Sequence, residues 1–235
     1  MNRNRSNLKR AGLVVALLIA AAASASAQTN TGSVAMSATV SKFVEIQSGG
    51  AVTLTGSSGG GVGTDGSAGQ PLGVSINLGE LGPSNASSFV TATVPLRLKS
   101  NAAYVLSVSA TVSSTGSTAN KITAADIGFG LGAVTRTGTG VNVSGTDTNA
   151  TSGDPTLAAN GSVNAATGRY EFTATRSNLS AFATSTTALS GSYIMNAVPR
   201  SNNNGLNVPA VFAVKPQFFE NGSTNINVTF TVTAP

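Results

Sequence analysis

The most restrictive feature of this sequence is a run in which apolar and polar side chains alternate without a break. From Val90 to Lys99, every even-numbered residue is apolar and every odd-numbered residue is Thr, Pro, Arg or Lys. Successive side chains of a β-strand point to opposite faces of its sheet, so the run predicts a strand with one face in a core. Arg97 and Lys99 are expected on its outer face. Pro95 cannot donate a ladder hydrogen bond and is expected at an edge or a bulge.

The same period of two recurs at residues 104–113 and 225–233 and predicts two further strands. Asn221-Gly222 is a hairpin turn signal, so residues 208–219 are expected to form the partner strand of the last one. Weaker strands are predicted at residues 34–46, 51–55, 72–78, 122–131, 169–175 and 192–198. Stretches rich in Gly, Ser, Thr and Asn at residues 56–69 and 138–161 are expected to be loops.

About ten strands with no helical pattern predict an all-β fold. We expect a single antiparallel β-sandwich of the immunoglobulin-like or fimbrial-like kind over residues 28–235. An outer-membrane β-barrel is the alternative architecture. The chain has no Trp and only three Tyr, which is poor in the aromatic girdles that such barrels carry.

The first 27 residues have the three parts of a secretory signal peptide. A basic head is followed by the apolar run 11–23 and by Ser24-Ala25-Ser26-Ala27, whose small residues suit a signal peptidase. Cleavage is expected after Ala27, with Ala25 as the alternative. The run is shorter than the roughly 20 residues that a transmembrane helix needs. We therefore expect an exported protein of the periplasm, cell surface or extracellular space, which meets the membrane only through this peptide before cleavage.

Removal of the signal peptide also changes the charge. It carries four of the 13 basic residues, which leaves nine against eight acidic residues and a net charge of about +1. The remaining basic residues are scattered along the chain. The composition therefore gives no reason to expect nucleic acid as a partner.

The chain offers little chemistry for catalysis. It contains no His and no Cys, which removes the usual general base, the thiol nucleophile and the commonest metal ligands. No two acidic residues have the spacing of a recognisable acid pair. We expect no enzyme, no catalytic residues and no cofactor. A weak calcium candidate is formed by the oxygen ligands of Asp147, Asn149 and Asp154, although Asp and Asn are also common turn formers.

The two ends of the chain after the signal peptide are typical of strand donation between subunits. Val34, Met36, Ala38 and Val40 share one face of an extended segment, and the chain closes on the alternating strand at 225–233. In strand donation, main-chain pairing gives affinity and alternate apolar side chains fill pockets. The alternative is that residues 28–41 pair within their own domain.

These two ends, together with the strand start Ser100-Asn101-Ala102-Ala103-Tyr104-Val105-Leu106, resemble fimbrial subunits of the chaperone–usher type. The resemblance implies a surface sandwich that polymerises. Many such subunits have a disulfide, and this chain has no cysteine for one.

Together these features predict a non-enzymatic, exported structural or adhesive protein that associates with itself or with other envelope proteins, because its strands carry few of the charges that protect sheet edges. A secreted module that binds a glycan or another ligand is the alternative function, and a membrane barrel is the second alternative.

Overall fold

The structure is a computed structural model. It describes residues 35–83, 89–137, 141–144, 148–149, 161–166, 168–172, 178–191, 193–196 and 205–235. The chain forms two units, residues 1–40 and 41–235. In the first unit, residues 35–40 are described; they belong to no strand and their side chains are exposed.

The second unit is all-β, and its described residues contain no α-helix. Two 3-10 turns, η2 (Ala124–Asp126) and η4 (Leu179–Phe182), interrupt the strands. The strands are β1 (Val44–Ser48), β2 (Thr53–Thr55), β3 (Gly61–Thr64), β4 (Ser75–Asn77), β5 (Val90–Ser100), β6 (Tyr104–Ser114), β7 (Ile127–Leu131), β8 (Thr135–Thr137), β9 (Val141–Ser144), β10 (Thr148–Asn149), β11 (Gly161–Val163), β12 (Tyr170–Phe172), β13 (Thr186–Gly191), β14 (Tyr193–Asn196), β15 (Gly205–Val214) and β16 (Thr224–Thr233).

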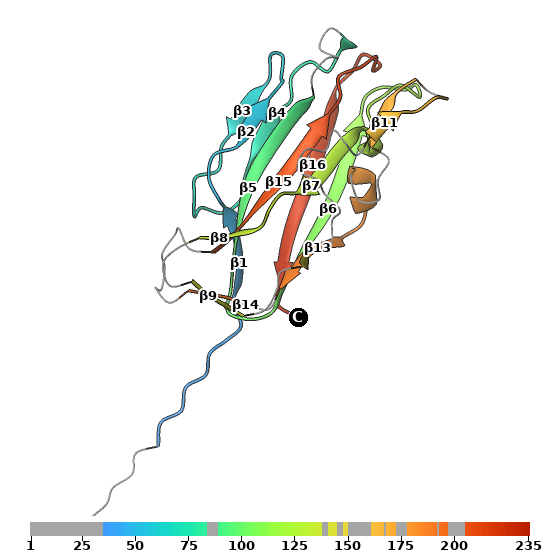
Figure 1. The fold of residues 1–235 in the computed structure, drawn as a ribbon. Helices are drawn as coiled ribbons and strands as arrows, with labels where there is room; N and C mark the ends of the chain where they lie inside the picture. The colour runs from blue at the N-terminus through green and yellow to red at the C-terminus, as the bar shows by residue number, and fades with distance from the viewer. Residues whose placement is uncertain are drawn as a thin grey trace, which may run out of the picture. The chain divides into compact units, whose positions relative to one another are not determined.

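The strands form antiparallel sheets that are not closed into a barrel within the described residues (Figure 1). In the eight-stranded sheet, β5 and β15 are central; β1 and β2 pair with β5, and β7 and β8 pair with β15. The second sheet has the order β10-β13-β6-β16. Two small hairpins, β3-β4 and β11-β12, complete the fold.

The alternating runs form the strands that they predict, namely β5, β6 and β16, but the predicted hairpin between the last two strands is wrong. β15 pairs with β5 and β7 in one sheet, whereas β16 pairs with β6 in the other. The segment 215–223, which contains Asn221-Gly222, therefore crosses from sheet to sheet. The predicted strand at 34–46 is also displaced, because the observed strand β1 begins at Val44.

The two main sheets share one hydrophobic core. The even-numbered residues of β5 and those of β6 from Tyr104 to Ala110 are buried. Leu96 and Leu106 lie fully buried in this core. At its centre lies Phe129 of β7, which makes an edge contact with Phe182 at a centroid distance of 4.9 Å and also contacts Phe230 of β16 at 6.3 Å. These aromatic contacts connect strands of both sheets, so the two sheets share one main core.

Pro95 lies in the central strand β5 rather than at the expected edge or bulge, and a gap between the two neighbouring strands β1 and β2 accommodates it. It lies opposite Pro209 in the β5–β15 pair. The carbonyl of Pro95 accepts from Gly49 N (2.7 Å), between β1 and β2, and the carbonyl of Pro209 accepts from Gly132 N (2.7 Å), between β7 and β8. The missing N–H of each proline thus faces a gap between two short strands, where no ladder bond is lost.

Arg97 is not on an exposed outer surface, as the alternation predicts, because its side chain is buried. Its guanidinium donates to Asn207 Oδ1 (3.2 Å) and to the carbonyl of Gly49 (3.2 Å). Asn207 lies on β15 at one side of β5, and Gly49 directly follows β1 at the other side. The hydrogen bonds of the buried guanidinium therefore connect β5 to the chain on both of its sides.

Candidate functional site

The candidate site is the open side of the fold where the edges of the two main sheets face each other, here called the seam. The four-stranded sheet ends there at β16, and the eight-stranded sheet ends at β1 and β2. In the part of the chain that the structure describes, no strand pairs with the outer edge of β16. Its outward backbone groups are therefore available to a further strand.

Apolar side chains line the seam without being fully buried. The four apolar residues on the inward face of β16 are partly exposed, namely Ile226, Val228, Phe230 and Val232. The inward residues of the neighbouring β6 are buried from Tyr104 to Ala110. The opposite side carries a second partly buried set: Val44, Ile46, Val52, Ile76, Leu78 and Leu81. Covering these side chains would contribute about 25 cal/mol for each Å² removed from water.

The outer edge of β16 lacks the features that usually protect an edge strand. Its ten residues include no charged residue and no proline, and its register with β6 continues from Thr224 to Thr233 without a bulge. Long, regular and uncharged edges are sites of strand addition.

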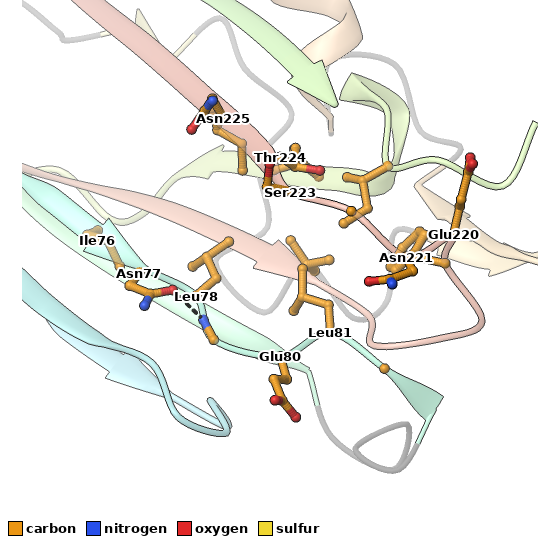
Figure 2. A pocket seen from close by; sticks show the side chains of 18 residues that line it. Ile76, Asn77, Leu78, Glu80, Leu81, Glu220, Asn221, Ser223, Thr224 and Asn225 are labelled. Carbon is orange, nitrogen blue, oxygen red and sulfur yellow. Dashed lines mark hydrogen bonds between the residues drawn. The ribbon is translucent and has the colours of Figure 1, made fainter. Parts of the chain in front are cut away.

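At one end the seam widens into a cleft of about 720 Å³ between the segment 76–82 and the start of β16 (Figure 2). Its apolar lining includes Ile76, Leu78, Leu81, Ile122, Ile127, Val214 and Ile226. Glu80 and Glu220 are the acidic residues of this lining, and Figure 2 shows their side chains pointing in different directions. The cleft is thus an apolar hollow with a polar rim, in which the two carboxylates do not converge.

At its other end the seam is closed. β1 contacts β16 there, and Lys42 Nζ donates to the carbonyl oxygen of Pro235. Asn101, in the turn between β5 and β6, accepts from Phe43 N (2.6 Å) and donates to the carbonyl of Ser41 (2.9 Å). The chain therefore enters the second unit at the end of the sheets opposite to the cleft.

Glu220 fixes the rim of the cleft to the loop that follows β6. Its carboxylate accepts from the backbone N–H and the hydroxyl of both Ser117 (3.1 and 3.3 Å) and Thr118 (2.7 and 2.7 Å). These hydrogen bonds, with the Ser117 backbone N–H first, lower the pKa of Glu220 from 4.5 to about 2. The carboxylate is therefore ionised throughout the neutral range.

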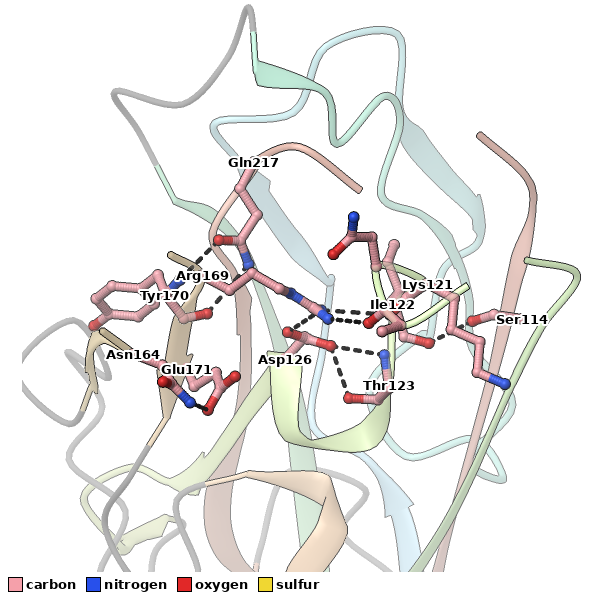
Figure 3. A network of polar contacts seen from close by, with 12 residues as sticks. Ser114, Lys121, Ile122, Thr123, Asp126, Asn164, Arg169, Tyr170, Glu171 and Gln217 are labelled. Carbon is pink, nitrogen blue, oxygen red and sulfur yellow. Dashed lines mark hydrogen bonds and ion pairs between the residues drawn. The ribbon is translucent and has the colours of Figure 1, made fainter. Parts of the chain in front are cut away.

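A second polar network ties the same loop to β12 (Figure 3). Arg169 pairs with the buried Asp126 at 2.5 Å and donates to the carbonyl of Ala119 at 2.8 Å. Its guanidinium also lies 5.2 Å from the centroid of the Phe219 ring. The two residues are 43 positions apart in the sequence, so no local spacing pattern predicts their contact.

The residues predicted to donate a strand lie in the first unit. Met36 is 92% exposed and Val40 is 84% exposed, and Ala38 is exposed as well. Val34 lies outside the described residues. This segment therefore exposes apolar side chains, as strand donation requires. The strand that it would pair with stays a prediction.

The calcium candidate falls largely outside the described residues, which include neither Asp147 nor Asp154. The backbone of Asn149 pairs with Leu189 in the short β10–β13 ladder. Within the described residues, no group of three or more acidic residues could hold a metal ion.

The aromatic pair of β12 is not an open platform. Phe172 is buried, and its ring lies 5.5 Å from Tyr170 and 6.2 Å from Phe89 in a small second core with Val211 and Ala213. Burial raises the pKa of the Tyr170 hydroxyl. The aromatic rings therefore attach the β11-β12 hairpin to the eight-stranded sheet.

No protein-family model matches this sequence, and no curated protein matches it. Among the helical segments in the described ranges, none has the length and apolarity of a membrane-spanning helix.

Proposed function

We propose that this chain is an exported structural or adhesive surface protein, a fimbrial-like β-sandwich whose copies assemble by strand donation. In this proposal, residues 34–40 of one copy occupy the seam of another. The observation that carries it is the seam itself. There the uncharged edge strand β16, whose outer edge has no partner among the described strands, adjoins incompletely buried apolar side chains.

The chemistry of the donor segment matches that of the seam. A strand added to β16 offers one face to the seam and the other to solvent. Val34, Met36, Ala38 and Val40 share one face, and the intervening residues are Ala35, Ser37 and Thr39. Backbone pairing with β16 and burial of the apolar face then act together, as in other cases of strand addition.

The positions of the two ends favour an open chain of copies over a closed dimer. The donor segment joins the second unit near Asn101, whereas the cleft lies beside Thr224, which pairs with Ser114 at the far end of β6. β6 has eleven residues, so about 35 Å separates these ends at roughly 3.3 Å per residue. A contact between different surfaces of identical copies is heterologous, and it continues into a filament when it does not close.

The test compares residues 28–235 with two double variants by light scattering after size exclusion and by negative-stain imaging. Met36→Asp with Val40→Asp places two charges on the apolar face and is expected to leave a folded monomer. The control, Ser37→Asp with Thr39→Asp, adds the same charge to the opposite face and is expected to assemble like the parent. Equal assembly of both variants, or a monomeric parent, would contradict strand donation.

A further inference from the structure

Two phenylalanines are exposed at opposite ends of the second unit. Phe218 is 79% exposed in the segment between β15 and β16, and Phe43 is 51% exposed just before β1. Exposed aromatic side chains are common anchors of protein interfaces when they are held in place before binding. Both of these residues are held in this way.

Phe218 is held by its neighbours on both sides. The Gln217 side chain accepts from Tyr170 N (2.8 Å) and donates to the Tyr170 carbonyl (3.1 Å), as a paired strand would (Figure 3). On the other side, Phe219 packs against the core, and Glu220 N donates to the carbonyl of Asn120 (3.0 Å). Phe218 is therefore exposed although the segment on both sides of it is held in place by contacts with the fold.

Phe43 is held by one residue, Asn101. Its N–H donates to Asn101 Oδ1 (2.6 Å), and its carbonyl accepts from Asn101 N (3.1 Å). Phe43 lies at the end of the second unit from which the donor segment extends, and Phe218 lies at the end with the cleft. The two side chains therefore belong to the two surfaces that a head-to-tail junction brings together.

We propose that Phe218 of one copy packs against Phe43 of the next copy at this junction. This inference rests on the proposed strand donation and adds a contact between the folded bodies of the two copies. One charged residue beside each phenylalanine favours this pairing. Lys42 adjoins Phe43 and Glu220 lies two residues from Phe218, so a head-to-tail contact brings opposite charges together.

Pairing of like ends is disfavoured for the same reason. It would place Lys42 against Lys42, or Glu220 against Glu220, across a two-fold axis. An aromatic pair between unlike ends instead combines edge or offset ring contact with burial of two exposed side chains. Because truncation of such an anchor commonly weakens binding by tenfold or more, Phe218→Ala is expected to raise the concentration needed for assembly by about that factor.

Cysteine pairing tests the contact directly, because the parent chain has no cysteine. Phe43→Cys with Phe218→Cys, assembled and then mildly oxidised with oxidised glutathione, is expected to give a ladder of disulfide-linked multimers on a non-reducing gel. Each single variant is expected to stay monomeric on that gel. The control Phe43→Cys with Val163→Cys uses another exposed position, since Val163 is 64% exposed, and is expected to give no ladder.

The outcomes separate this inference from strand donation. If light scattering shows assembly but the 43–218 pair gives no ladder, the aromatic junction is wrong and strand donation stands. Dimers formed by Phe218→Cys alone would overturn the head-to-tail arrangement. If the parent chain does not assemble at any concentration, both proposals fail.

Discussion

Gly128 lies close to the ring of Phe172. The effect of Gly128→Ala on the free energy of unfolding is therefore expected to change sign when Phe172 is replaced by Ala. A Cβ atom at Gly128 would lie 2.6, 2.7 and 3.0 Å from three carbons of the Phe172 ring. Carbon atoms prefer separations of about 3.5–4.0 Å, so Gly128→Ala must push the ring outward by about 1 Å. Gly128 does not have a positive φ angle, and the substitution therefore adds no backbone strain.

The size of the effect follows from the burial of Phe172, which is 3% exposed. A buried aromatic side chain removes at least about 150 Å² from water, and re-exposing half of this area costs about 2 kcal/mol at 25 cal/mol per Å². Alanine is favoured over glycine in a strand by about 0.5–1 kcal/mol. Gly128→Ala is thus expected to lower the free energy of unfolding by about 1–1.5 kcal/mol. In a Phe172→Ala background the ring is absent, and Gly128→Ala should raise the free energy of unfolding by about 0.5–1 kcal/mol.

Urea unfolding of the four proteins in this double-mutant cycle measures the coupling, which is expected to be about 2 kcal/mol. Phe172→Ala alone is expected to cost about 3–5 kcal/mol. If Gly128→Ala has the same effect in both backgrounds, Phe172 does not pack on Gly128. The ring would then occupy a position other than the one beside Gly128.

Two further predictions concern the polar networks beside the cleft. Because hydrogen bonds from Ser117 and Thr118 lower the pKa of Glu220 to about 2, ionised Glu220 contributes stability above its ordinary pKa of 4.5 that is lost as the pH falls toward 2. Thermal unfolding of the parent and of Glu220→Gln should therefore differ most near pH 7 and converge toward pH 2; a constant difference would contradict this origin. Asp126→Asn leaves the largely buried Arg169 without its carboxylate and is expected to cost about 3 kcal/mol in urea unfolding. A cost under about 0.5 kcal/mol would show that the pair contributes no more than a surface ion pair.

The strands that pack one face on the core were predictable from the sequence, and their partners were not. The pattern of Val90 to Lys99 arises because alternate side chains enter the core, so the period of two determines β5 without knowledge of the fold. The hairpin at Asn221-Gly222 was inferred from turn chemistry alone. β15 is buried on much of both faces, which is typical of a strand inside a sheet, and it pairs there with β5 and β7.

The two segments that the candidate site involves were predictable from the sequence, but the seam between the sheets was not. The apolar face at Met36 and Val40 and the alternation of β16 are visible in the sequence, because each depends on local spacing. The seam depends on which strands end the two sheets, and that is set by long-range pairing. The contact between Asp126 and Arg169 is likewise formed by distant residues, and Arg97 is buried by strands that its own alternating pattern does not describe.

Hydrogen–deuterium exchange of β16 tests the central claim, that the seam receives a strand from another copy, most directly. In the Met36→Asp, Val40→Asp variant, the outward amides of Thr224–Thr233 are expected to exchange rapidly, because the outer edge has no partner among the described strands. In the assembled parent the same amides should become protected, while the amides of the neighbouring β6 stay protected in both proteins. Equal exchange of β16 in the assembled parent and in the monomeric variant would contradict the account, because the edge would then gain no strand on assembly.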